Sequence, residues 1–100
     1  MSKAKPVSLG EKYFLRQKDA LAHFSEMLSR YQVDEIVNDL DSIDLLELLR
    51  RHPHFDSKVG SGIGRFRAII SPDGSKCFGI ERINGSIVDF SFIRCITRIW

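Results

Sequence analysis

Residues 63–90 read IGRFRAIISPDGSKCFGIERINGSIVDF, three runs rich in apolar residues that are separated by two turn-forming sequences. The run from Ile63 to Ile70 alternates with a period of two, which is typical of a half-buried strand. Ser71-Pro72-Asp73-Gly74 has the composition of a type I turn, and Asn84-Gly85 has that of a type I′ hairpin turn. We therefore predict a three-stranded antiparallel meander.

The second turn also predicts a register. If Asn84-Gly85 is a two-residue loop, Arg82 pairs with Ile87 and Ile80 pairs with Asp89. Arg82 and Asp89 then lie diagonally on one face of the sheet, within reach of a salt bridge. We interpret them as a structural ion pair, because partly buried charges need partners. A catalytic arginine–aspartate pair is the alternative.

Two stretches upstream of the meander have helical periodicity. A helix is predicted near residues 17–31, with Leu21, Phe24, Leu28 and Tyr31 at its apolar positions. A second, leucine-rich helix is predicted over residues 42–51, with Ser42 as its N-cap. This helix stops at His52, because Pro53 disfavours the helical conformation of the residue before it.

The two ends of the chain complete the predicted fold. Residues 1–10 are polar and interrupted by proline and glycine, which indicates a flexible tail. Tyr13 to Arg16 is β-prone and indicates an extra edge strand. Residues 91–100 favour a helix with Ser91 as the N-cap, and Trp100 is the aromatic residue that we expect to be exposed. Residues 11–100 thus predict one α+β domain, in which two N-terminal helices pack on the three-stranded meander and a C-terminal helix follows.

A glycine-rich segment, Gly60-Ser61-Gly62-Ile63-Gly64, precedes the first strand of the meander. Glycine permits positive φ and lets backbone N–H groups approach a phosphate. The order helix, glycines, strand is the reverse of a P-loop or Rossmann motif, which argues against a mononucleotide cradle. We interpret Gly60 and Gly62 as a structural connection that needs positive φ. Close approach of a nucleic-acid backbone is the alternative.

Histidines and cysteines do not have the spacing of a metal site. His52 and His54 flank Pro53, and Cys77 and Cys95 lie 18 residues apart, which is not a zinc-finger pattern. We expect buried free thiols, no metal and no cofactor. An enzyme acting on nucleic acid through His52, His54 and Asp89 is a further hypothesis, and it requires these side chains to converge in one cleft.

Charge is distributed unevenly along the chain. Residues 1–49 carry six Lys and Arg against nine Asp and Glu, a net charge of −3, whereas residues 50–100 carry nine against four, a net charge of +5. The basic half suggests a polyanionic partner, although attraction between the two halves explains the same asymmetry. No secretory signal is recognisable, and no run approaches the ~20 apolar residues of a membrane span, so we expect a soluble, cytoplasmic protein.

The order of short motifs resembles that of a known family. The motifs are Leu48-Leu49-x-x-His52-Pro53, Lys58-x-Gly60-x-Gly62, Phe66, Cys77-Phe78, Arg82, Gly85-Ser86, Asp89-Phe90-Ser91 and Cys95. Their order and spacing resemble the DCL domain ("defective chloroplasts and leaves"), a domain of formally unknown function. The likeness extends from about residue 13 to residue 97. Lys76 and Asn84 stand where arginine and aspartate are more usual.

This resemblance implies a small α+β module connected with RNA. Plant relatives are linked with the maturation of chloroplast ribosomal RNA, and related domains end the largest subunits of plant RNA polymerases that serve small-RNA silencing. Small bacterial versions stand alone, and this chain is similar to them. The resemblance implies no catalytic residue.

We therefore predict a non-catalytic RNA-binding or RNA-processing accessory module that uses a basic face, with a protein-interaction module as the alternative. The residues predicted to contact RNA are Arg51, His54, Lys58, Arg65, Arg67, Lys76, Arg94 and Arg98. The residues predicted to have structural roles are His52, Pro53, Gly60, Gly62, Arg82, Asp89 and Ser91.

Overall fold

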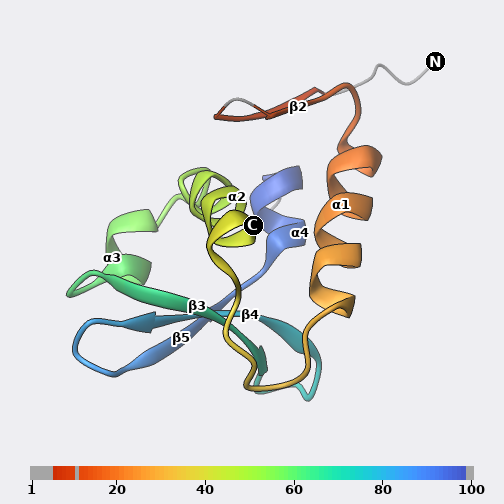
Figure 1. The fold of residues 1–100 in the computed structure, drawn as a ribbon. Coiled ribbons are helices and arrows are strands. Elements are labelled where there is room, and N and C mark those ends of the chain that lie inside the picture. Colours follow the sequence, from red (N-terminus) through yellow and green to blue (C-terminus); the bar gives the residue numbers. More distant parts are fainter. Residues whose placement is uncertain (1–5, 11, 99–100) are drawn as a thin grey trace.

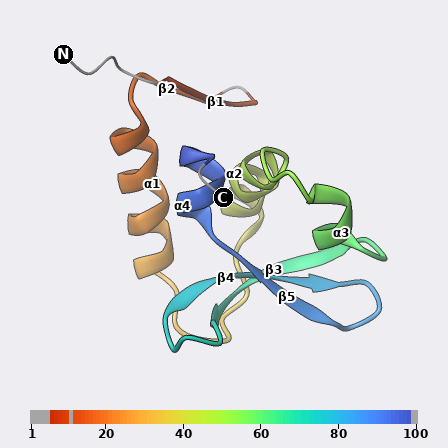
Figure 2. The ribbon, with the colours of Figure 1, turned by 180° about the vertical axis from the view of Figure 1, so that it is seen from behind.

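The computed structural model describes residues 6–10 and 12–98. In chain order the elements are β1 (Val7–Leu9), β2 (Lys12–Phe14), α1 (Gln17–Ser29), α2 (Asp39–Leu49), α3 (Phe55–Val59), β3 (Ile63–Ile70), β4 (Lys76–Arg82), β5 (Ile87–Phe90) and α4 (Phe92–Thr97). The α+β prediction is confirmed. The helices α1, α2 and α4 lie between the β1–β2 hairpin at one end and the three-stranded sheet at the other (Figures 1 and 2).

The predicted meander is confirmed, with antiparallel strands in the order β3-β4-β5. Its two hairpins are built alike. The Gly74 N–H donates to the Ser71 carbonyl at 2.9 Å, and the Gly85 N–H donates to the Arg82 carbonyl, also at 2.9 Å. Both glycines have a φ of +90°, which residues with a side chain rarely adopt. Each connection is therefore a three-residue loop that ends in a glycine bulge.

The second hairpin corrects the predicted register. A type I′ turn needs positive φ at both central residues, and Asn84 does not have it. The additional loop residue shifts the pairing by one position, so the Arg82 N–H donates to the Ser86 carbonyl and Gly79 lies opposite Asp89. The predicted pairs of Arg82 with Ile87 and of Ile80 with Asp89 are wrong. The Arg82 and Asp89 side chains form no ion pair in the described structure.

The core lies between the sheet and the helices α1, α2 and α4. An aromatic cluster joins these layers: the Phe92 ring of α4 lies 6.3 Å from Phe78 of β4 and 6.4 Å from Phe24 of α1. The helices predicted near residues 17–31 and after Ser91 are confirmed in α1 and α4. The Ser91 hydroxyl accepts a hydrogen bond from the Arg94 N–H at 3.2 Å and so caps α4 as predicted. Trp100 lies outside the described residues.

The second helix begins earlier than predicted. Asn38, not Ser42, is its N-cap, and the Asn38 side chain accepts a hydrogen bond from the Asp41 N–H at 2.8 Å. The helix α2 ends at Leu49, before Pro53. The short helix α3 was not predicted, because five residues are too few to display a helical period.

The predicted flexible tail over residues 1–10 is wrong for β1. Val7 and Leu9 are 0% and 3% exposed, and β1 pairs with β2 in an antiparallel hairpin. Residues 1–5 lie outside the described part of the chain. The strand predicted at Tyr13 to Arg16 exists as β2, but it belongs to this separate hairpin and not to the edge of the larger sheet. Alternation over three residues was too short to reveal β1 in the sequence.

The outer edges of the larger sheet are covered in different ways. Along β3 the backbone of residues 34–37 forms hydrogen bonds, among them Val37 N–H to the Phe66 carbonyl at 2.9 Å. Along β5 the Lys58 ammonium of α3 donates to the Asp89 carbonyl at 2.8 Å. Among the described residues, no helix is long and apolar enough to cross a membrane.

Candidate functional site

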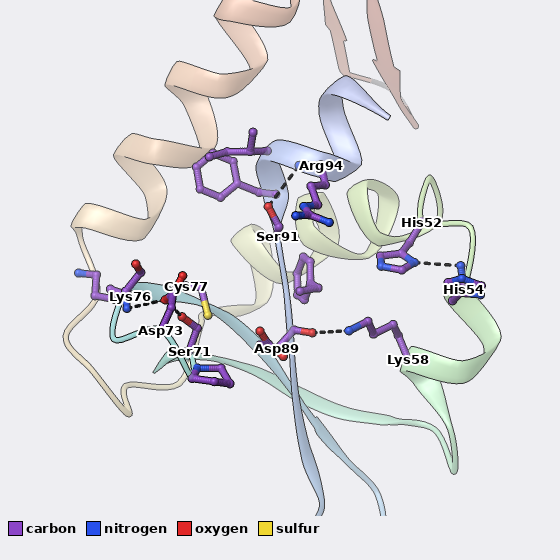
Figure 3. A pocket seen from close by; sticks show the side chains of 15 residues that line it. His52, His54, Lys58, Ser71, Asp73, Lys76, Cys77, Asp89, Ser91 and Arg94 are labelled. Carbon is purple, nitrogen blue, oxygen red and sulfur yellow. Dashed lines mark hydrogen bonds between the residues drawn. The ribbon is translucent and has the colours of Figure 1, made fainter. Parts of the chain in front are cut away.

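A groove of about 710 Å³ follows the outer edge of β5. It is lined by α3 and the turn before it, by the β3–β4 turn and the start of β4, and by the start of α4 (Figure 3). Four of the eight residues predicted to contact RNA line it, and they come from three separate segments. They are His54, Lys58, Lys76 and Arg94. We call this the β5-edge groove.

The wall formed by α3 depends on the His52-Pro53-His54 sequence. The helix α2 ends before Pro53, and the His52 ring turns back so that its Nδ1 atom accepts the His54 backbone N–H at 2.9 Å. This places Lys58 one turn further along, where its ammonium reaches the β5 edge. The predicted structural role of His52 and Pro53 as a helix stop agrees with this arrangement.

The opposite wall carries Lys76 and Arg94. The Lys76 ammonium donates to the Tyr31 carbonyl at 2.6 Å, which ties the start of β4 to the end of α1. Arg94 lies in the first turn of α4, whose position Ser91 fixes. The Arg94 side chain is exposed, and its guanidinium makes no hydrogen bond or ion pair with the described residues.

Two titratable groups in the groove are held neutral. Burial, followed by the charges of Lys58 and His54, lowers the pKa of His52 below its ordinary value of 6.5, so this imidazole is uncharged at pH 7. Burial, followed by the carboxylates of Asp89 and Asp73, raises the pKa of the Cys77 thiol. Cys77 is therefore a weak nucleophile, since thiolate is the reactive form. Cys77 and Cys95 are free thiols, as predicted, but only Cys95 is buried; Cys77 is partly exposed.

His52, His54 and Asp89 all line the β5-edge groove, which is the location that the enzyme hypothesis required. The hydrogen bonds of these residues are less favourable for catalysis than their location. The Nδ1 atom of His52 is occupied by the His54 N–H, and the Lys58 ammonium binds the backbone carbonyl of Asp89 and not its carboxylate. No group of three His, Cys, Asp or Glu side chains among the described residues has the geometry of a metal site.

Arg65 and Arg67 lie on β3, at the opposite edge of the sheet from β5, and do not line the β5-edge groove. They share one carboxylate, with Arg65 Nε 3.0 Å and Arg67 Nη2 2.6 Å from the two oxygens of Glu81. The hydrogen bond from Arg67, with the Arg65 charge adding to it, lowers the pKa of Glu81. Sequence reasoning did not single out Glu81. The pairing of β3 with β4, which sets it opposite Arg65, was the missing information.

Arg51 and Arg98 also lie away from the groove. Arg51 donates from Nε to the Cys95 carbonyl at 2.8 Å and from Nη2 to the Ile96 carbonyl at 3.0 Å, so it satisfies carbonyls at the end of α4. Burial, together with the nearby Arg98 charge, lowers the pKa of Arg51. Arg98 is exposed and ends α4 with a φ of +58°.

Arg82 is a structural brace, but its partners differ from the prediction. It donates to the Lys58 carbonyl at 3.0 Å and to the Ser57 carbonyl at 2.9 Å, at the end of α3. Gly60 makes this possible: its φ is +57°, and a Cβ there would lie 2.8 Å from Arg82 Nε. Gly62, with φ +125°, confirms the predicted need for positive φ in this connection. Arg82 therefore holds α3, and with it Lys58, beside the sheet.

Comparison with known proteins places these features in a family. The profile of the family described as "Protein of unknown function (DUF3223)" matches residues 25–96, which include every residue of the β5-edge groove. The chain belongs to this family. Relatives named as Protein DCL confirm the resemblance seen in the sequence motifs: the chloroplastic protein of Solanum lycopersicum is 37% identical over 63% of this chain and 29% of its own length.

Other relatives extend the comparison. Protein EMBRYO DEFECTIVE 514 of Arabidopsis thaliana is 32% identical over 97% of this chain, which spans about half (49%) of that protein. The DNA-directed RNA polymerase IV subunit 1 of the same plant is 34% identical over 70% of this chain and 5% of its own length. The solution NMR structure of an uncharacterized protein from Rhodospirillum rubrum has the same fold, with a TM-score of 0.84, 40% identity and coverage of 95% of this chain and 91% of that chain.

Proposed function

We propose that this DUF3223 chain is a non-catalytic RNA-binding module and that the β5-edge groove is its contact surface. The observation that carries the proposal is the meeting of Lys58, Lys76 and Arg94, with the His54 imidazole, in one groove. These cations are far apart in the sequence, so the fold concentrates positive charge that the sequence distributes. Phosphate groups of RNA are the polyanion that such a surface attracts.

The cations keep donors for a ligand. A lysine ammonium has three N–H donors, and the observed hydrogen bonds of Lys58 and Lys76 use one each. Arg94 keeps all five of its guanidinium donors, and its planar fork suits a phosphate. Asp89 and Asp73 also line the groove and reduce its charge. Affinity should therefore be moderate and strongly dependent on salt.

The rings in the groove favour unpaired over paired RNA. His54 is exposed and Phe92 is half-buried, and both line the groove. Unpaired bases can stack on such rings, whereas the bases of a duplex already stack on each other. An RNA context is supported by one relative, which is named as a subunit of an RNA polymerase. The cytoplasmic location expected from the sequence is part of this proposal.

A salt titration tests the proposal. Binding of a fluorescent single-stranded oligoribonucleotide to the full chain is measured by anisotropy over a range of potassium chloride concentrations. If Lys58, Lys76 and Arg94 neutralise three phosphates, the slope of log K against log salt is about −2. The Arg94→Gln variant should bind more weakly and should make the slope less negative by about 0.7. No measurable affinity at low ionic strength would overturn the proposal.

Arg65→Gln is the matched control, because it also removes one exposed arginine charge but lies outside the groove. We expect it to leave the affinity unchanged. If Arg65→Gln weakens binding and Arg94→Gln does not, the open face of β3 is the interface and the groove is not. The same samples are run on a denaturing gel. We expect the RNA to remain intact. If the RNA is cleaved and the His54→Ala substitution abolishes the cleavage, the protein is a nuclease and not a binding module.

A further inference from the structure

A second groove, of about 540 Å³, lies at the opposite edge of the sheet, between α2 and the start of β3. Its lining is mainly apolar and includes Ile36, Ile43, Leu46, Ile63 and Phe66. We call it the β3-edge groove. It shares no lining residue with the β5-edge groove, and the strand order β3-β4-β5 puts the two grooves on opposite sides of the sheet.

Large apolar side chains are exposed in the lining of the β3-edge groove, at Ile36 and Ile43, and at Leu40, one turn before Ile43 on α2. Ile36, Leu40 and Ile43 are 45%, 78% and 61% exposed. The helix α2 already buries Leu45, Leu48 and Leu49 on its inner face, so Leu40 and Ile43 contribute little to the core. Adjacent exposed apolar side chains beside a groove are typical of a protein-interaction surface.

The charge around this groove is mainly acidic; the one cation among its lining residues, Arg65, is paired with Glu81. Residues 33–49 contain six Asp and Glu and no Lys or Arg. Some of these carboxylates are neutralised within the fold: Asp41 pairs with Arg30, Asp44 with Lys12, and Glu47 with Arg50. Asp34, Glu35 and Asp39 are exposed and form no ion pair with the described residues.

We propose that the β3-edge groove is a docking site for a basic segment of a partner protein, one that presents apolar side chains flanked by Lys or Arg. The apolar anchors would bury Leu40 and Ile43 together with the groove floor. The flanking cations would face the carboxylates of Asp34, Glu35 and Asp39, which form no ion pair with the described residues. An amphipathic helix in an apolar groove is the recognition mode that combines these features.

The same charges disfavour two other occupants. The phosphates of RNA would be repelled by the three unpaired carboxylates. A second copy of this chain, bound through the same patch in a twofold dimer, would bring two acidic patches together. The inference does not rest on RNA binding, because the two grooves have no residue in common.

The test uses the isotope-labelled full chain and two designed peptides of about four helical turns each. Both carry leucines at helical spacing; one has lysine and the other has glutamate at the remaining positions. We expect the lysine peptide to shift the NMR amide signals of residues 36–46 and 63–66, and we expect the glutamate peptide to leave them unchanged. Shifts that centre on another surface, or no shifts, would overturn the inference.

Substitutions test the anchors. The double variant Leu40→Ser/Ile43→Ser should retain the fold, since both side chains are exposed, and should weaken the lysine peptide by about tenfold or more. Ile83→Ser/Ile87→Ser is the matched control, because these residues flank the β4–β5 turn, are 72% and 51% exposed and do not line the β3-edge groove. An equal loss in both double variants would overturn the inference.

Two further outcomes count against the basic partner. If the oligoribonucleotide shifts the signals of residues 36–46, the β3-edge groove binds nucleic acid. If the unliganded chain self-associates and Leu40→Ser/Ile43→Ser abolishes this, a second copy is the occupant. Loss of RNA affinity in Arg94→Gln leaves the inference untouched, so the two proposals fail independently.

Discussion

The two edges of the larger sheet differ in what closes them and in the charge around them. At β3, backbone groups of residues 34–37 pair with Phe66 and Ala68, at distances of 2.6 to 3.0 Å. At β5, the Lys58 side chain binds the Asp89 carbonyl. Exposed carboxylates of residues 34–39 lie near the β3 edge, whereas three cations line the groove at the β5 edge together with Asp73 and Asp89. Exposed strand edges invite pairing with other chains, so each must be covered.

The comparison teaches that the edges suit different ligands. A backbone segment cannot leave β3 without breaking several hydrogen bonds, so a ligand there must bind on top of the existing structure. A lysine side chain can turn toward a phosphate while α3 stays in place, because its ammonium has further donors. We therefore expect the β3 edge to be the more rigid and the β5 edge to be the more responsive.

Val37→Pro should have the largest effect, because it breaks the closure of the β3 edge. It removes the N–H that binds Phe66 and leaves a buried carbonyl without its partner. We expect a loss of about 3 kcal/mol in the free energy of unfolding, measured by urea denaturation. Val33→Pro is the control, because the Val33 N–H does not pair with β3 and Val33 is 44% exposed. A similar loss of stability in Val33→Pro would show that the edge pairing is not the cause.

Gly60→Ala should have the next largest effect, because it pushes Arg82 away from α3. Strain at positive φ and the contact with Arg82 Nε together should cost about 2 kcal/mol. Gly85→Ala is the matched control: its φ is also positive, but a Cβ there meets nothing within 4 Å. Chemical denaturation should show the smaller loss for Gly85→Ala. Equal losses would mean that the Arg82 brace contributes nothing.

Lys58→Met should cost about 1 kcal/mol, because it removes the hydrogen bond to Asp89 and keeps the length of the side chain. The uncovered β5 edge should also exchange its amide hydrogens faster, which NMR can measure residue by residue. Lys18→Met removes an exposed lysine of α1 and should change neither quantity. Unchanged exchange at residues 87–89 in Lys58→Met would contradict the proposed cover.

The smallest expected effect is on the pH dependence of the free energy of unfolding, through His52 in the β5-edge groove. Because the pKa of His52 is lowered in the folded state, the unfolded chain binds the proton more tightly. The stabilisation is fully present above the ordinary pKa of 6.5 and is lost as the pH falls through the lower folded value. Urea titrations across this pH range should show a smaller fall in the free energy of unfolding for His52→Asn than for the wild type. An identical fall would exclude His52 as its source.

The turns and the register show what a single sequence can reveal about this fold. Pro72 and the glycines at 74 and 85 act within four residues, so the positions of both hairpins could be predicted. The Asn84-Gly85 pair supports more than one loop length, and the longer one was formed. The one additional loop residue shifted every pairing between β4 and β5 by one position and removed the predicted Arg82–Asp89 contact.

The amino-acid sequence by itself determined the meander, the two long helices, the helix stop at Pro53 and the family. These depend on local backbone preferences and on periods of two or 3.6 residues, which are legible in short windows. Only the tertiary structure decided which charges meet. Glu81 pairs with both Arg65 and Arg67, and Arg51 binds carbonyls at the end of α4. Lys58, Lys76 and Arg94 share one groove. Such contacts join residues far apart in the chain, and packing and strand register, not local preference, bring them together.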